Sequence, residues 1–217
     1  MRNRRSIDII SILVAGAALV TIALFSWDFR PPVDRGLHAE IGRALAKEAL
    51  SLARPGAEIT VITRDTEAFR QPALDILLKS FQQEIGRAGS IAVTTHALQL
   101  DPLRPVEVPP GDFYELIRRS PADRIIVSFL GPPALTEEQR GALGTVKPKI
   151  IALCSGNLAE SLDLQELFKA GLLHAALVNR RPAPGAADVS RKSSGAFDGL
   201  YTIVRGDPSS ERSHAGR

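Results

Sequence analysis

Between residues 58 and 178 the chain alternates short β-rich segments with longer amphipathic ones, and this alternation restricts the fold more than any other feature. Two of the β-rich segments, residues 124–130 and 149–154, are apolar almost throughout, with no regular polar alternation. Such strands are typical of a parallel sheet that helices cover on both faces. The sequence therefore predicts a three-layer α/β domain.

The amphipathic segments carry recognisable helix signals. The segment at 72–88 begins with a proline, and Thr136 has capping-box spacing to Gln139. Another amphipathic helix is expected over residues 36–53, before the first strand. The expected strands cover residues 58–63, 90–97, 124–130, 149–154 and 173–178, and residues 197–204 are a candidate edge strand. We expect a mostly parallel sheet of about five strands, Rossmann-like or flavodoxin-like.

The start of the chain predicts a membrane anchor. Residues 9–27 carry no charged side chain, and arginines precede them at positions 2, 4 and 5. A helix over 9–27 would span roughly 28 Å, close to the ~30 Å hydrocarbon core of a bilayer. Because basic flanks stay cytoplasmic, we expect residues 1–8 inside and the rest of the chain outside. A cleaved signal peptide and a buried helix of a soluble domain are the alternatives.

The composition fits one modest domain behind this anchor. We expect a single-pass protein of a bacterial inner membrane, with a juxtamembrane segment and helix at 28–56, an extracytoplasmic α/β domain at 57–181 and a polar region with a disordered tail at 182–217. The formal net charge of +3 comes from the two ends of the chain, so no basic surface for a nucleic-acid partner is expected. The chain has one cysteine, so an intramolecular disulfide is excluded. The lack of a disulfide is normal for exported bacterial domains.

Polar residues follow several of the expected strands, and they are the candidate ligand-binding residues. In open α/β sheets, ligands bind outside the carboxyl ends of the strands. We expect one rim to be formed there, with Arg64 placed to pair with an anionic group and Asn157 to hydrogen-bond. Histidines and the cysteine lack metal-site spacing and no phosphate-binding glycine pattern is present, so neither metal nor cofactor is expected. The rim candidates are Arg64, Asp65, Thr95, Ser155 and Asn157.

One enzymatic alternative rests on residues 152–156, Ala-Leu-Cys-Ser-Gly. This segment resembles the G-x-C-x-G elbow of class I glutaminases, with Ala152 in place of the first glycine. It would make the chain a membrane-anchored cysteine hydrolase in which Cys154 is the nucleophile and His96 or His174 the base. A cysteine at the end of an apolar strand is more often a small buried hydrophobe. Since no acidic partner follows from the spacing, a binding role is favoured over an enzymatic one.

The order of segments resembles one lobe of the type I periplasmic binding proteins. The residues that carry this resemblance are 58–64, 90–95, Ala122-Asp123 followed by an apolar strand, and Lys147-Pro148-Lys149 followed by another. The resemblance covers residues 57–180, one lobe of a two-lobed family, and transfers no ligand residue. It implies an extracytoplasmic binding or interaction module for a small polar ligand or a membrane-protein partner, such as an accessory of a transport or envelope complex.

Overall fold

The structure is a computed structural model that describes residues 16–18, 20–21, 33–67, 70–89, 91–100, 108–156, 162–180 and 196–206. The chain divides into two compact units, Met1–Asp34 and Arg35–Arg217. In the first unit, residues 16–18 and 20–21 are helical. Among the described residues, no helix has the length and apolar character needed to cross a membrane. Most of the anchor expected at 9–27 lies outside the described residues, so it stays a prediction.

The second unit is built on one six-stranded sheet with the strand order β2-β1-β3-β4-β5-β6. Strands β1 to β5 are parallel to one another, and β6 runs antiparallel to β5. The predicted α/β class with a mostly parallel sheet is therefore confirmed. The strands are β1 (Glu58–Arg64), β2 (Ala92–Leu98), β3 (Ile125–Ser128), β4 (Lys149–Cys154), β5 (Ala175–Asn179) and β6 (Tyr201–Arg205).

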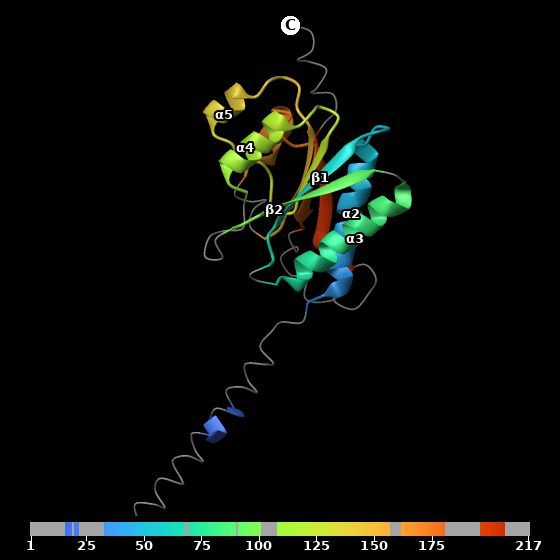
Figure 1. Ribbon diagram of the computed structural model, residues 1–217, viewed down its shortest axis with the longest axis vertical. Helices are drawn as coiled ribbons and strands as arrows, with labels where there is room; N and C mark the ends of the chain where they lie inside the picture. Colours follow the sequence, from blue (N-terminus) through green and yellow to red (C-terminus); the bar gives the residue numbers. More distant parts are fainter. Residues whose placement is uncertain are drawn as a thin grey trace, which may run out of the picture. The chain divides into compact units, whose positions relative to one another are not determined.

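Helices cover both faces of this sheet, as Figure 1 shows for α2 and α3 on one side and α4 and α5 on the other. The apolar strands explain this arrangement because successive side chains point to opposite faces. In β3, Ile125 and Val127 pack into one core cluster and Ile126 packs into the other. The helices are α2 (Arg35–Leu52), α3 (Pro72–Ala88), α4 (Pro110–Arg119), α5 (Glu137–Ala142), α7 (Leu164–Lys169) and α8 (Ala196–Leu200).

The helix signals read from the sequence correspond to observed helix ends. α3 begins at Pro72, and Thr136 caps α5 with a reciprocal capping box to Gln139. At the chain's other end, the candidate edge strand over 197–204 is only half right. Its first residues belong to α8, and the strand is limited to β6, where the β-favouring Tyr-Thr-Ile-Val run lies.

Helix α2 packs closely against α3. Gly42 of α2 faces the backbone of Leu77 and the side chain of Ser80 on α3, with no room for a larger residue. Ile41 and Leu45 flank this glycine and are buried in the same cluster as Phe81. A residue without a side chain at position 42 thus lets the two longest helices of the unit pack together.

Candidate functional site

The strand order creates a topological switch point between β1 and β3. From β1 the chain passes through α3 to β2 on one side, and from β3 it passes through α5 to β4 on the other. The connections that leave β1 and β3 therefore diverge, although the two strands are neighbours. In doubly wound sheets this divergence is where a ligand crevice forms.

Arg64 and Asp65 lie at this point, but both are engaged within the chain. Arg64 ends β1, is 8% exposed, and its Nη2 donates to the backbone carbonyl of Leu100 at 3.1 Å. The carboxylate Oδ1 of Asp65 accepts from the backbone N–H of Glu67 at 2.9 Å. The Asp65 backbone N–H donates to the carbonyl of Leu98 at 2.8 Å. Arg64 therefore ties the end of β1 to the segment after β2, and Asp65 closes a turn.

Thr95 does not lie on the rim with them. The sequence placed it next to a strand end, but β2 continues to Leu98, and Thr95 pairs with Val61 in the middle of β1. Three residues at ~3.3 Å each put it about 10 Å before the carboxyl edge. The strand was expected to reach residue 97 and reaches Leu98, so Thr95 lies within the strand on either count.

The loop after β4 brings one more candidate to the carboxyl edge. Ser155 directly follows β4 and is exposed, and Gly156 after it has a φ of +64°, which favours glycine. Asn157 lies outside the described residues. The structure thus brings Arg64, Asp65 and Ser155 to the carboxyl edge of the sheet and separates Thr95 from them.

Thr63 is a polar residue at the same edge that was not among the candidates. It is 4% exposed, and its Oγ1 has no hydrogen-bond partner in the described part of the chain. Its neighbour across the switch point is the buried segment after β3, since the N–H of Phe129 donates to the carbonyl of Ile62 at 3.0 Å. The signal in the sequence was a threonine at the end of an apolar strand.

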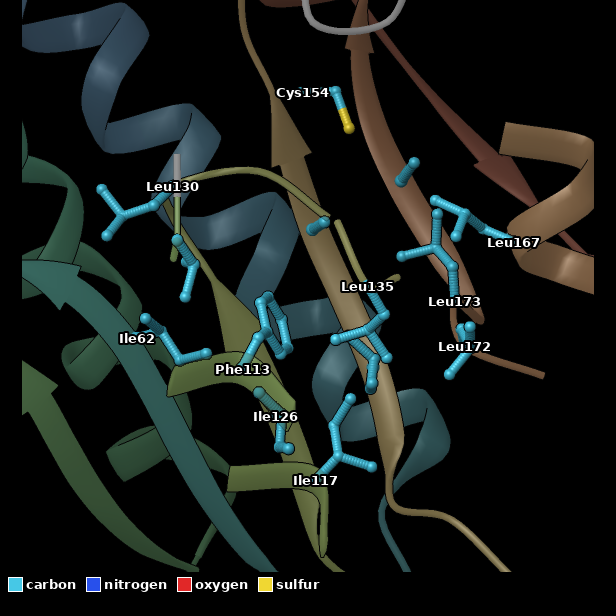
Figure 2. Close-up of a cluster of buried hydrophobic side chains, with 14 of the residues drawn as sticks. Ile62, Phe113, Ile117, Ile126, Leu130, Leu135, Cys154, Leu167, Leu172 and Leu173 are labelled. Carbon is cyan, nitrogen blue, oxygen red and sulfur yellow. The ribbon is translucent and has the colours of Figure 1, made fainter. Parts of the chain in front are cut away.

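Cys154 does not have the surroundings of a nucleophile. Its side chain is 0% exposed and belongs to an apolar core cluster, at one end of the side chains drawn in Figure 2. Burial raises the pKa of the Cys154 thiol to about 12, so the thiolate is scarce at neutral pH.

Neither proposed base can reach this cysteine. The strand register puts His174 level with Ile150, four residues before Cys154 and therefore about 13 Å away along the strand. His96 lies level with Ala152 but three strands away, about 14 Å at ~4.8 Å per strand. This geometry does not support the hydrolase alternative.

A second feature, not anticipated from the sequence, is an open groove of about 550 Å³ between α2 and the α8–β6 segment. At its base Glu48, which is 5% exposed, accepts two hydrogen bonds from Arg205, from Nε at 2.7 Å and Nη2 at 2.6 Å. These bonds raise the pKa of Arg205. The sequence signal was a glutamate inside the apolar stripe of α2. The groove is also lined by Glu40, Arg43, Lys47 and Ile203.

Over the described ranges, no group of three or more His, Cys, Asp or Glu side chains is arranged to hold a metal ion. The polar groups at both features are therefore hydrogen-bond donors and acceptors, with no metal-ligand set.

Comparisons with known proteins give structural neighbours only. No protein-family model and no curated protein sequence matches the chain. A sugar-binding protein of a Bacillus halodurans transporter matches with a TM-score of 0.44 and 14% identity over 65% of this chain and 45% of its own. A Burkholderia graminis solute-binding protein, solved with D-arabinose, matches with a TM-score of 0.41 and 15% identity over 65% and 47%.

A glucose-galactose binding protein from Geobacillus stearothermophilus is a further neighbour, with a TM-score of 0.38 and 14% identity over 67% of this chain and 48% of its own. The chain thus spans about half the length of the solved structures it matches. These neighbours share a partial structural similarity with this chain at 14–15% identity.

Proposed function

We propose that this chain is a membrane-tethered binding protein whose α/β domain lies outside the cytoplasm and binds a small polar ligand there. The tether is the uncharged stretch at 9–27, preceded by arginines at positions 2, 4 and 5. This arrangement corresponds to a single-pass protein of a bacterial inner membrane with a cytoplasmic N-terminus. An accessory role in a transport or envelope complex is consistent with such a tethered module.

The observation that carries the binding role is the switch point between β1 and β3. The diverging connections at this point are the part of a doubly wound sheet where ligands bind. The proposed site is formed by the Asp65 turn, the exposed Ser155 and the hydroxyl of Thr63, which has no hydrogen-bond partner among the described residues. Hydroxyl and carboxylate groups suit a ligand with several hydrogen-bonding groups, whereas Arg64 is already engaged by Leu100.

A thermal-shift screen of the full chain in nonionic detergent tests the site. Small polar metabolites are added one at a time, and unfolding is followed by circular dichroism, since a specific ligand raises the melting temperature by mass action. We expect Asp65→Asn, which keeps the turn-forming Oδ1, and Ser155→Ala to reduce the shift. Gln83→Ala, an exposed change on α3, is the matched control. A ligand that stabilises all four proteins equally would contradict this site.

The tether has its own test. A reporter enzyme fused after Arg217 is expected to be active only when exported, and the unshortened chain is expected to stay in membranes washed with alkaline carbonate. Reporter activity in the cytoplasm would refute the orientation. Release of a shortened chain would instead favour the cleaved signal peptide.

A further inference from the structure

The groove between α2 and β6 is separated from the switch point by the strand order, because β4 and β5 lie between β3 and β6. Arg205 pairs with Ala175, the first residue of β5, whereas the carboxyl end of β5 is Asn179. The groove also contains Phe197 and Asp198 of α8, just before Tyr201, which pairs with Asn179. It therefore extends along β6 and is not confined to one end of the strands. A ligand at this groove would be separate from one at the carboxyl edge of β1 and β3.

The central feature of the groove is an arginine that a buried carboxylate orients. Glu48 is 5% exposed and holds Arg205 through two short charge-assisted hydrogen bonds, while the side chain of Arg205 remains 60% exposed. The Nε–H and one Nη2–H of Arg205 are committed to Glu48, and the Nη1 group is not part of this pair. A ligand that enters the groove therefore meets a fixed guanidinium, with its counter-charge hidden beneath it.

Two further cations, both on α2, line the same groove as this guanidinium. Arg43 and Lys47 line the groove one turn apart, and Lys47 is exposed. Arg43 is 3.8 Å from the carboxylate of Glu40, which is beyond hydrogen-bond distance, so its N–H groups are not committed to that ion pair. Ile203 adds an apolar floor. The oriented Arg205 and two further cationic donors in one groove provide the chemistry that binds an oxyanion.

We propose that this groove binds the oxyanion group of a small ligand, a carboxylate or a phosphate, through Arg43, Lys47 and Arg205. Its volume of about 550 Å³ is within the range of small-molecule sites. Glu48 acts as a positioning residue, because both of its carboxylate oxygens accept hydrogen bonds from Arg205 and fix the guanidinium plane. Glu40 and Asp198, which also line the groove, favour ligands that carry a cationic or hydrogen-donating group next to the oxyanion.

The competing explanation is that the Glu48–Arg205 pair only fastens β6 to α2. That role predicts a loss of stability when the pair is broken, but no anion-specific effect at positions outside the pair. The informative variant is therefore Arg43→Gln/Lys47→Gln, which leaves Glu48 and Arg205 unchanged. The matched control is Arg87→Gln/Arg118→Gln, which removes two exposed helix arginines from α3 and α4.

The test titrates inorganic phosphate and, separately, succinate against the full chain in nonionic detergent. Sodium chloride keeps the ionic strength constant, and melting is followed by circular dichroism. We expect a saturable rise in melting temperature with at least one of the two anions. The apparent dissociation constant should rise at least about tenfold in Arg43→Gln/Lys47→Gln and stay unchanged in the control, as expected for lost charge-assisted hydrogen bonds.

The two anions distinguish the ligand classes. A response to phosphate alone assigns a phosphate ligand, and a response to succinate alone assigns a carboxylate ligand. Arg205→Lys, which keeps the charge but loses the planar fork, should weaken either response. If neither anion raises the melting temperature above the sodium chloride control, the proposal is overturned. An equal response in the Arg43→Gln/Lys47→Gln variant would overturn it as well.

Discussion

Replacement of Gly42 by alanine should destabilise the domain, although alanine is the better helix former. A Cβ at position 42 would lie closer than 3.0 Å to both the Ser80 hydroxyl and the Leu77 carbonyl oxygen, and 3.1 Å from the Phe81 nitrogen. The serine can rotate, at the cost of its hydrogen bonds to the carbonyls of Ile76 and Leu77. The Leu77 carbonyl belongs to the backbone of α3 and cannot, so α2 and α3 must move apart.

The size of the effect follows from two opposing terms. Overpacking in a well-packed contact costs about 1–3 kcal/mol, and here backbone is involved, which favours the upper end. Replacing a glycine inside a helix by alanine stabilises the helix by about 1 kcal/mol. We expect Gly42→Ala to lower the free energy of unfolding by about 2 kcal/mol. For a domain of this size, that corresponds to a melting temperature lower by about 4–8 °C.

Gly86→Ala on α3 is the matched control, because a Cβ there would meet nothing within 4 Å. It should raise stability by up to about 1 kcal/mol. Urea unfolding of the full chain in nonionic detergent, followed by circular dichroism at the helix band, measures both variants. Gly42→Ala/Ser80→Ala should recover only part of the loss, since the Leu77 carbonyl remains. If Gly42→Ala is as stable as Gly86→Ala, the close packing of α2 on α3 is refuted.

Three further predictions concern the core, the cysteine and the buried ion pair. Ile151→Ala should cost about 2–5 kcal/mol in urea unfolding because Ile151 is 1% exposed on a central strand, and a cost below about 0.5 kcal/mol would contradict that placement. A thiol reagent at pH 8 should modify Cys154 only after unfolding. Because the pKa of this thiol is raised to about 12 from 9.0, its contribution to stability is complete below pH 9 and is lost as the pH rises toward 12. Comparison with Cys154→Ala across that range checks this dependence. Arg205→Ala should lower the free energy of unfolding by about 3 kcal/mol and Glu48→Gln by about 1 kcal/mol, because only the first leaves a buried carboxylate without its partner. Equal losses would argue against the burial of Glu48.

The α/β class could be predicted because its evidence is local in the sequence. The strands β3 and β4 are apolar on both faces, and the run Pro72–Ala88 carries both a proline start and an apolar stripe. Neither feature depends on distant residues. The strand order and the antiparallel direction of β6 depend on how the connections cross the sheet, which no local pattern contains.

The candidate site was less predictable because its hydrogen bonds join distant parts of the chain. The guanidinium of Arg64 is bound by the carbonyl of Leu100, 36 residues away, so a position at a strand end did not make it free for a ligand. Thr95 was wrongly assigned to the rim, because it lies inside a strand that was expected to reach residue 97 and reaches Leu98. Glu48 and Arg205 are 157 residues apart, and only the glutamate within an apolar stripe hinted at their pairing.

Helix α2 connects these observations. One side of it packs on α3 through Gly42, and another side carries the buried carboxylate that holds Arg205 of β6. Moving α2 away from α3 therefore also changes where Glu48 meets the guanidinium. The two effects are coupled within about two turns of one helix, so substitutions at positions 42 and 48 should not be additive. A stable α2–α3 contact is accordingly a condition for the geometry of the groove between α2 and β6, whereas the switch point between β1 and β3 is set by the strand order of the sheet.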